Sequence, residues 1–396
     1  MDLKQTIVGV PKETYPGETL VALAPSHVPL LTKAGLQVVV EPDAGRAAGF
    51  ENEAYQSNGA HLATNRVQLF ASTQVLLQVR TLGANPDKGR DDLALLRPEH
   101  TVIGLADPLG QPQAVKELST RGVSLFAMEL MPRIARAQSM DVLSSLATIA
   151  GYKSVLLAAL QLPKLFPMMT TAAGTIPPAR VLVIGAGVAG LQAIATARRL
   201  GAAVSAYDVR PASKEQIKSV GAKVVELPVK FTEAEQVGGY AKMLNEELAQ
   251  QQRSLLNPVI AASDVVIATA AVPGLPAPLL ITADMIVRMA QGSVIVDVAA
   301  DRGGNCELTR PNETVRHHGV VILGPTNLPS TVPTHASVLY GRNIANMLLH
   351  VCKNGVVCAD PEDEITRETL VTRRGEVVHP RIASLLNVER EAHVST

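Results

Sequence analysis

The sequence predicts an α/β protein with two doubly wound domains, each built on a parallel sheet, joined by long helices. Short apolar runs alternate with helix-like stretches in two separate series along the chain, and this alternation is typical of parallel sheets. The 396 residues are 47% hydrophobic and 18% charged, which suits two domains that each bury a sizeable core. Tryptophan is absent and aromatic residues make up 3%, so the cores should be mainly aliphatic.

The first series of elements lies between residues 6 and 129. Runs rich in β-branched residues predict its strands, and the stretches between them predict helices. The expected strands are 6–10, 36–41, 73–79, 101–107 and 123–129, and the expected helices are 26–35 and 113–122.

An apolar helix is expected next, after residue 139 and running to about residue 162, long enough to connect two domains. Residues 170–179, which are small and end in two prolines, predict a loop. The second series follows, and 337–352 reads as a helix with no sheet of its own that packs back on the first domain. The expected strands of this series are 180–185, 202–208, 222–227, 264–269, 293–299 and 320–325.

These elements predict a discontinuous domain organisation. An outer α/β domain is expected from 1–137 plus 326–396. An inner domain, 138–325, is inserted into it and includes the linking helix.

Charge, cysteine and histidine content narrow the class of protein. The net charge is zero without a basic run, so nucleic acid is not an expected partner. Cys306, Cys352 and Cys358 form no CxxC pair, which fits a reducing compartment. Cys306 is expected to be a buried, inert thiol. The nine histidines show no metal-ligand spacing, so no metal is expected.

No targeting or membrane segment is evident from the sequence. The amino-terminal stretch lacks the layout of a signal peptide. The nearest approach to a membrane span, 181–197, is slightly short and contains glycines and Gln192, so the chain is expected to be soluble.

The most informative stretch is "VLVIGAGVAGLQAIATARRLGAAVSAYDVR". Gly185, Gly187 and Gly190 form GxGxxG between an apolar strand and a helix, the context in which this pattern indicates a dinucleotide site. The first glycine permits a tight turn, the second lets the backbone approach a pyrophosphate, and the third lets helix and strand pack closely. A glycine turn in a parallel fold that binds no nucleotide is the alternative.

Asp208 ends the following strand, 18 residues after Gly190 (208 − 190). A carboxylate there can accept hydrogen bonds from the adenosine ribose and would repel a 2′-phosphate, so NAD(H) is expected rather than NADP(H). Arg210 complicates this expectation, because a nearby arginine can receive a 2′-phosphate.

Longer motifs resemble the NAD(H)-binding subunit of the proton-translocating transhydrogenases, in their split bacterial form. They follow one another over nearly the whole chain. The motifs are "PKETYPGET" (11–19), "AMELMPRIARAQSMDVLSS" (127–145), "PPARVLVIGAGVAGLQAIATARRLGA" (177–202), "YDVRPASKEQ" (207–216), "GGYAKM" (238–243), "PGLPAPLLIT" (273–282), "GSVIVDVAADRGGNCELT" (292–309) and "GPTNLPS" (324–330). The resemblance implies two Rossmann-like domains with the NAD site in the cleft between them.

The resemblance also implies roles for individual residues. Arg133, Asp141 and Ser144 would hold the NADH nicotinamide and ribose, and Gln138 would reach toward the partner's nucleotide; these four are the expected catalytic residues. Gly238 and Gly239 would form the hinge of a closing loop that carries Tyr240. The expected cofactor-binding residues are Arg133, Gln138, Leu143, Ser144, Gly185, Gly187, Val188, Ala189, Gly190, Asp208, Val209, Arg210, Gly239, Tyr240 and Ala271.

Helix capping is the alternative explanation for the polar residues near position 140. Ser139 is a suitable N-cap, and Asp141 in the first turn would complement the helix dipole. Capping and a functional role can coexist. Thr148 departs from the family, which often has an asparagine there.

Alanine dehydrogenases, relatives with the same two-domain plan, are the main rival. They carry an arginine where this chain has Leu20 and a lysine in the strand where this chain has Arg80. They place a histidine at the end of the strand matching 101–107, whereas residues 101–126 contain none here and His100 stands at the wrong end. Oxidising an amino acid requires a general acid or base, so its absence favours a reaction that moves no proton at the site.

The expected function is therefore direct hydride transfer between NADH and NADP+ bound on a partner subunit, active only with partner subunits. The implied partners are an NADP(H)-binding beta subunit and a membrane-spanning subunit that couples transfer to proton translocation; this chain binds NAD(H) but not NADP(H). A homodimer is expected, cytoplasmic and held peripherally at the inner face of the cell membrane. The alternatives are an alanine dehydrogenase-like enzyme and a non-catalytic NAD-binding module.

Overall fold

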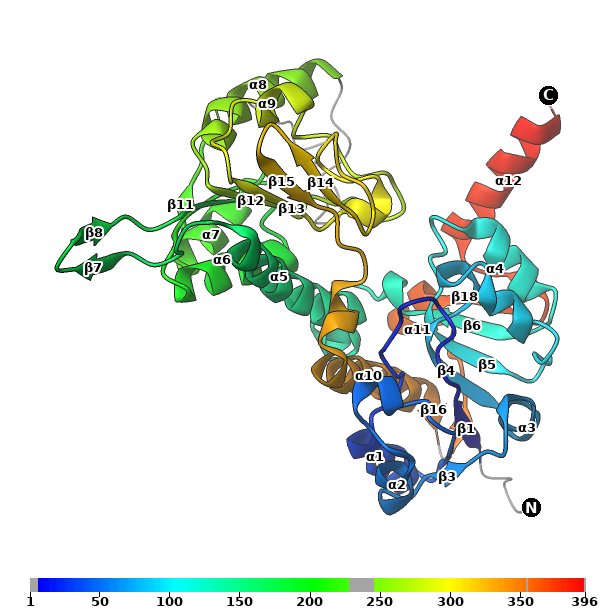
Figure 1. The fold of residues 1–396 in the computed structure, drawn as a ribbon. Coiled ribbons are helices and arrows are strands. Elements are labelled where there is room, and N and C mark those ends of the chain that lie inside the picture. The colour runs from blue at the N-terminus through cyan, green and yellow to red at the C-terminus, as the bar shows by residue number, and fades with distance from the viewer. Residues whose placement is uncertain (1–5, 228–245, 354, 395–396) are drawn as a thin grey trace. The chain divides into compact units, whose positions relative to one another are not determined.

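The computed structural model describes residues 6–227, 246–353 and 355–394, and it divides into two compact units (Figure 1). Unit 1 comprises Met1–Leu146 with Pro329–Thr396, and unit 2 comprises Ala147–Leu328. The first dividing point therefore falls inside helix α5 (Val142–Gln161) rather than before it.

Unit 1 is built on an eight-stranded sheet in the order β19-β18-β6-β5-β4-β1-β2-β3. Its first six strands along the chain are parallel and follow the 3-2-1-4-5-6 order of a doubly wound fold, with the switch point between β1 and β4. The strands are β1 (Ile7–Val10), β2 (Gln37–Val40), β3 (His61–Leu62), β4 (Val75–Arg80), β5 (Thr101–Leu105), β6 (Ser124–Ala127), β18 (Leu370–Arg373) and β19 (Glu376–Val377).

The C-terminal segment belongs to unit 1, as expected, but it also adds two strands to that sheet, which the sequence did not predict. Strand β18 pairs antiparallel with β6, and β19 pairs antiparallel with β18. A further hairpin joins β16 (Cys352–Lys353) to β17 (Val356–Val357). The sheet is thus mixed at one edge. The sequence did not predict β18 and β19 because they are short and lie far from β6 along the chain.

Helices cover the unit 1 sheet because their apolar stripes face it. Leu69 and Phe70 of α3, Val115 of α4 and Ile382 of α12 pack on sheet residues such as Leu76 in one buried cluster. The helices of unit 1 are α1 (Val28–Lys33), α2 (Asn52–Ser57), α3 (Arg66–Ser72), α4 (Pro112–Ser119), α10 (Pro333–Val351), α11 (Glu364–Thr369) and α12 (Pro380–Val394).

Helix α10 is the long helix that the sequence predicts near 337–352, and it belongs to unit 1. Its proline at the first position suits a helix start. The buried Tyr340 hydroxyl donates to the carbonyl oxygen of Gln78 in β4 at 2.8 Å. Gly341 passes so near the 22–27 segment that a Cβ there would lie 3.0 Å from Ala24 N. Helix α10 is therefore fixed against the unit 1 sheet.

Unit 2 repeats the same topology in a seven-stranded sheet of order β11-β10-β9-β12-β13-β15-β14. The switch point lies between β9 and β12, and the edge strand β14 is antiparallel. Its strands are β9 (Arg180–Ile184), β10 (Ala203–Tyr207), β11 (Lys223–Val224), β12 (Val265–Ala268), β13 (Val294–Asp297), β14 (Thr314–His317) and β15 (Val320–Leu323).

Both faces of the unit 2 sheet are covered, because alternate strand residues point to opposite sides. Val181 and Val183 of β9 face a cluster with α5 and α6, whereas Leu182 and Ile184 face a cluster with α8 and α9. The helices are α6 (Val188–Arg199), α7 (Ser213–Ser219), α8 (Glu246–Ala261) and α9 (Ala283–Ile286).

Among the described residues, α5 is the one helix long and apolar enough to cross a membrane by those two criteria. In the most apolar part of α5, 39% of the residues are buried. Val155 and Ala158 of this helix belong to the core of unit 2. The stretch named from sequence, 181–197, instead forms β9 and most of α6.

The predicted loop at 170–179 contains a hairpin instead. Strands β7 (Met169–Thr171) and β8 (Gly174–Ile176) pair antiparallel, and all six residues are exposed. Threonine and isoleucine favour strands, and Gly174 adopts φ 127° at the turn. Figure 1 shows the hairpin reaching away from the sheet of unit 2.

Candidate functional site

The glycine turn lies at the switch point of unit 2, between β9 and α6. Gly185 adopts φ 93°, and a Cβ on Gly190 would lie 1.8 Å from the Gly185 carbonyl oxygen. Gly187 is exposed, and a Cβ there would meet nothing within 4 Å. The turn thus has one glycine that bends the chain, one that leaves open space and one that allows helix–strand contact.

The first turn of α6 follows directly, with Val188 exposed and Ala189 half-buried. The first N–H groups of any helix lack partners within the helix, which makes its amino end suitable for an anion. Helix α5 passes this turn closely, since a Cβ on Gly151 would lie 2.1 Å from the Ala189 carbonyl oxygen.

Asp208 follows β10, and its side chain is 6% exposed. One oxygen accepts the Ala186 N–H at 2.7 Å, and the other accepts the Arg210 N–H at 2.9 Å. The Arg210 guanidinium also binds both oxygens at 2.9 Å. Burial opposes ionisation of Asp208, but the hydrogen bond and charge of Arg210 outweigh it and lower the pKa of the carboxyl. Val209 between them packs partly on the unit 2 core.

The loop after β12 supports the glycine turn, a role that the sequence analysis missed. Thr269 donates its hydroxyl to the Gly185 carbonyl oxygen at 2.9 Å. The buried Asn305 side chain accepts the Ala270 N–H at 3.0 Å and donates to the Ala270 oxygen at 2.8 Å. Ala271, the next residue, is exposed. The "DRGGNCEL" motif contained the available signal for Asn305.

Asp297 at the end of β13 holds that motif in place. Its buried carboxylate accepts the Ala299 N–H at 3.1 Å, the Cys306 N–H at 2.9 Å and the Thr309 hydroxyl at 2.7 Å. Burial raises the pKa of the Cys306 thiol to about 11. Only a thiolate is a good nucleophile, so Cys306 is an inert, buried thiol, as expected.

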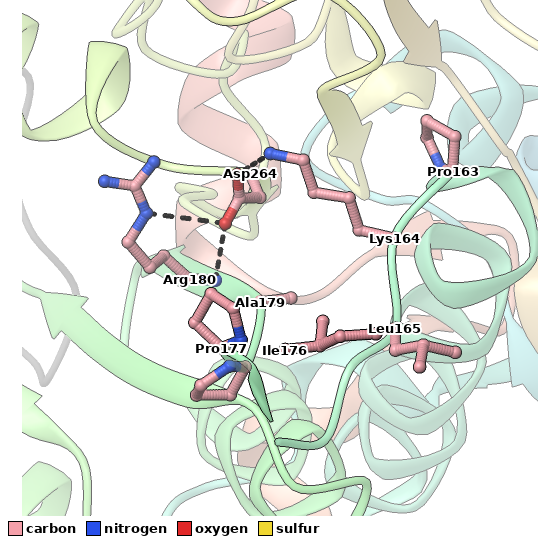
Figure 2. Close-up of a pocket in the computed structure, with 9 residues that line it drawn as sticks. Pro163, Lys164, Leu165, Ile176, Pro177, Ala179, Arg180 and Asp264 are labelled. Carbon is pink, nitrogen blue, oxygen red and sulfur yellow. Dashed lines mark hydrogen bonds and ion pairs between the residues drawn. The ribbon is translucent and has the colours of Figure 1, made fainter. Parts of the chain in front are cut away.

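A pocket of about 660 Å³ lies at the amino ends of the unit 2 strands, opposite the glycine turn (Figure 2). Asp264 beside it pairs with Lys164 at 2.7 Å and accepts the Arg180 N–H at 2.8 Å. The Arg180 guanidinium approaches the same carboxylate at 3.4 Å. Because Arg180 starts β9 and Asp264 precedes β12, this pocket is at the amino ends of the strands, away from the glycine turn.

The polar residues near position 140 lie in unit 1, in a 3₁₀ turn (Ala135–Met140) and the start of α5. Ser139, which the capping alternative took as the N-cap, does not cap this helix. Asp141 is extended and accepts the Ser144 N–H at 2.9 Å and the Ser144 hydroxyl at 2.5 Å, so Asp141 is the N-cap. Aspartate caps a helix as well as serine does, and the 3₁₀ turn delays the start of the α-helix.

The other predicted residues of this segment are accessible to different degrees. Arg133 and Gln138 are exposed, whereas Leu143 and Ser144 are half-buried. Because of the 3₁₀ turn and the extended Asp141, Gln138 does not lie on one α-helical face with Asp141 and Ser144.

The carboxyl edge of the unit 1 sheet is filled by its own side chains. The Arg80 guanidinium pairs with Glu18 at 2.7 Å, and the Glu18 side chain is 1% exposed. Arg80 also lies over the Tyr15 ring, 4.4 Å from its centroid. His100 lies at the opposite end of the strands, because it precedes β5, and its ring contacts the carbonyl oxygens of Phe70 and Thr73. At the carboxyl edge, the positive charge of Arg80 is thus already paired with Glu18.

Glu129 ties together the ends of β5 and β6. One of its oxygens accepts the N–H groups of Ala106 and Asp107, each at 2.7 Å, while the other is buried without a hydrogen-bond partner. Burial raises the pKa of Glu129 to about 7, although the two N–H groups favour the ionised form. When Glu129 is protonated, the proton would lie on the oxygen that has no hydrogen-bond partner.

The predicted site residues divide between the two units. Unit 1 holds Arg133, Gln138, Asp141, Leu143 and Ser144, whereas unit 2 holds Gly185, Gly187, Val188, Ala189, Gly190, Asp208, Val209, Arg210 and Ala271. Gly239 and Tyr240, with the proposed hinge, lie outside the described residues. In the described ranges, no group of three or more His, Cys, Asp or Glu side chains is arranged to hold a metal ion.

Family models match both halves of the chain. The model for the alanine dehydrogenase/PNT N-terminal domain matches residues 9–150, and that for the C-terminal domain matches 154–380. The chain belongs to the alanine dehydrogenase/PNT family.

Its relatives within the alanine dehydrogenase/PNT family differ in closeness. The first portion of an NAD(P) transhydrogenase subunit alpha from Rhodospirillum rubrum is 44% identical over 378 residues, which cover 95% of this chain and 98% of that protein. A transhydrogenase structure from Sinorhizobium meliloti has a TM-score of 0.83 and 42% identity, covering 94% and 100% of the two chains. Alanine dehydrogenase from Bacillus subtilis is 29% identical, covering 97% and 95%.

This family member is thus a homologue of NAD(P) transhydrogenase subunit alpha, and the alanine dehydrogenases are more distant relatives. The Rhodospirillum protein is named as one portion of a divided alpha subunit, and it therefore belongs to a larger assembly.

We predict that Gly190→Ala and Gly187→Ala differ sharply in stability. A Cβ at Gly190 would meet a backbone oxygen at 1.8 Å, whereas one at Gly187 would meet nothing within 4 Å. The first change should lower the free energy of unfolding by more than about 2 kcal/mol, and the second by less than about 0.5 kcal/mol. Chemical denaturation measures both, and equal losses would contradict the close contact.

We predict that Glu129→Gln removes a pH dependence of stability. The folded pKa of about 7 exceeds the ordinary 4.5, so the contribution of Glu129 to stability is full at pH below 4.5 and is lost as pH rises through 7. The amide keeps an acceptor for the two N–H groups and cannot ionise. Between pH 4.5 and pH 8, unfolding free energies should shift in favour of the variant by up to about 3 kcal/mol. Parallel pH profiles would refute a proton on Glu129.

Proposed function

We propose that this chain binds NAD(H) and passes hydride directly between NADH and NADP+ held by a partner subunit. The proposal rests on a difference between the carboxyl edges of the two sheets. At the switch point of unit 2, an open glycine turn stands beside the Asp208 carboxylate. At the matching edge of unit 1, Arg80 is paired with Glu18.

Residues of unit 2 fit the ends of an NAD(H) molecule. Gly187 leaves space for a pyrophosphate to approach, and the first turn of α6 supplies N–H groups and the positive end of a dipole. Asp208 would accept hydrogen bonds from a ribose, with Val209 and Arg210 beside it. Thr269 and Asn305 would hold the turn and the Ala271 loop in shape. We assign Gly239 and Tyr240 to a loop over the nucleotide by family resemblance alone.

The residues of the 3₁₀ turn would place the reacting ring rather than exchange protons. NADH supplies the hydride at C4 of its nicotinamide when it is bound. Arg133 and Gln138 offer exposed donors and acceptors for that ring and for the partner's nucleotide. Asp141 and Ser144 fix the backbone from which they project. Hydride transfer then depends on holding two rings roughly 3–3.5 Å apart and excluding water.

An amino-acid dehydrogenase activity is disfavoured by the residues of unit 1. A substrate carboxylate would need a free cation, but Arg80 is engaged by Glu18 and by the Tyr15 ring. Residues 101–126 contain no histidine, and His100 lies at the amino end of β5. Neither β5 nor the residues that follow it up to 126 therefore supply a histidine that could exchange a proton with an amino acid.

We further propose that the chain works as a homodimer within a larger complex. Its partners would be an NADP(H)-binding beta subunit and a membrane-spanning subunit, which would hold it at the cytoplasmic face of the membrane. The exposed hairpin β7–β8 supports the homodimer. Met168, Met169 and Ile176 are 64%, 42% and 47% exposed, and an isolated two-stranded hairpin is marginally stable in water.

A reconstitution assay tests the proposal. The purified chain is mixed with an NADP(H)-binding beta subunit and NADP+. Hydride would pass from NADH to NADP+ and from the resulting NADPH to an NAD analogue, whose reduction is followed. Turnover that needs both proteins and no amino acid is the expected result. NADH oxidation by this chain alone with pyruvate and ammonium would show an alanine dehydrogenase instead, and tight NADH binding without turnover in either assay would show a binding module.

We predict that Gln138→Asn slows hydride transfer in this assay about tenfold, because the shorter amide would displace the two rings relative to each other. The dissociation constant for NADH should change less than about twofold, since most of the nucleotide would bind in unit 2. Stopped-flow absorbance and equilibrium titration measure the two quantities. A large loss of NADH affinity would argue against a placing role for Gln138.

A further inference from the structure

Asn343 on helix α10 binds two points of the polar segment at once. Its side-chain N–H donates to the Ser139 carbonyl oxygen at 2.9 Å. Its side-chain oxygen accepts the Ser145 hydroxyl at 2.7 Å. All three residues belong to unit 1. Asn343 therefore joins the 3₁₀ turn to the first turn of α5.

The two anchor points flank the capping residue of α5. Between Ser139 and Ser145, Asp141 accepts both the N–H and the hydroxyl of Ser144. Side-chain hydrogen bonds thus hold the junction between the 3₁₀ turn and α5 at Ser139, at Asp141 and at Ser145. Such a set fixes backbone that would otherwise be free to change its path.

Asparagine suits this position because it is both donor and acceptor. The Asn343 residue is 6% exposed, so leaving its side-chain amide without hydrogen-bond partners would be costly. Asn346, one turn further along α10, donates to the same Ser139 oxygen at 2.9 Å. A carbonyl oxygen can accept both bonds.

Helix α10 is itself a firm base for these contacts. Tyr340, one turn before Asn343, is fully buried and donates to Gln78 in the unit 1 sheet. The path from sheet to polar segment therefore runs through a buried hydrogen bond of Tyr340 and part-buried hydrogen bonds of Asn343, on neighbouring turns of one helix.

Gln138 is the residue whose placement depends most on this arrangement. It immediately precedes Ser139, it is exposed, and within the described ranges its side chain makes no hydrogen bond of its own. The backbone at 138–139, where Asn343 and Asn346 bind, therefore sets the point and direction from which the Gln138 side chain leaves the chain.

We propose that Asn343 is a positioning residue that aims Gln138 by holding the Ser139 carbonyl oxygen. The inference rests on the proposed function of Gln138 in placing the two nicotinamide rings. Asn343 would touch neither nucleotide. Its loss should therefore lower the rate of hydride transfer while leaving NADH affinity nearly unchanged.

Asn343→Asp is the main test. It keeps the acceptor for Ser145 and sets an oxygen against the Ser139 carbonyl. With the beta subunit present, hydride transfer should slow by between about tenfold and a hundredfold, with the NADH dissociation constant changed less than about twofold. Ser145→Ala, which removes only the other bond, should cost less. Leu339→Ala, an exposed residue on the same helix, is the control and should leave the rate unchanged.

A double-mutant cycle separates positioning from general damage. If Asn343 acts through Gln138, adding Asn343→Asp to Gln138→Ala should change the rate little, less than about twofold. Rate losses that multiply would show independent effects and would overturn the inference. So would an unchanged rate in folded Asn343→Asp.

Hydrogen exchange gives a readout that does not depend on activity. The amides of residues 138–145 should exchange faster in Asn343→Asp than in wild type, with α10 itself still protected. Unchanged exchange in this segment would overturn the inference alone. Absence of hydride transfer by the wild-type chain with its partner would overturn the proposed function and this inference together.

Discussion

The contact between Gly190 and the end of β9 is the constraint on which the rest of unit 2 depends. Helix α6 can begin where it does because residue 190 has no side chain between it and the Gly185 carbonyl oxygen. The same oxygen accepts the Thr269 hydroxyl, and the loop after β12 is held in turn by Asn305. A larger residue at 190 would thus disturb both strands of the switch point.

The two units share one strand order and use its switch point differently. In unit 2 the crevice edge is lined by glycines and leaves open space at Gly187. In unit 1 the corresponding edge is closed by Arg80, Glu18 and Tyr15. Ligands of open α/β sheets bind at such edges, so an internal ion pair changes what a fold of this type can accept. Fold alone would not have distinguished these two outcomes.

The sequence predicted most strands of both sheets and the glycine turn, because those signals are local. The hairpin at 169–176 was missed because alanine, glycine and proline outweighed its threonines. Strand β18 was missed because it pairs with β6, more than 240 residues earlier. The support given by Thr269 and Asn305 likewise rests on contacts between distant segments. The capping residue of α5 was misplaced because serine and aspartate cap equally well, and only the backbone at Asp141 decides between them.

The ion pair of Asp208 and Arg210 has a thermodynamic consequence for the proposed nucleotide. The carboxylate already accepts hydrogen bonds from its own chain on both oxygens. A ribose that binds there would exchange one set of bonds for another, so its net gain is a small difference between two bonded states. Arg210 thus acts as an internal competitor. Competition of this kind would favour quick release of the proposed nucleotide, as a catalyst that exchanges its nucleotide in every cycle would require.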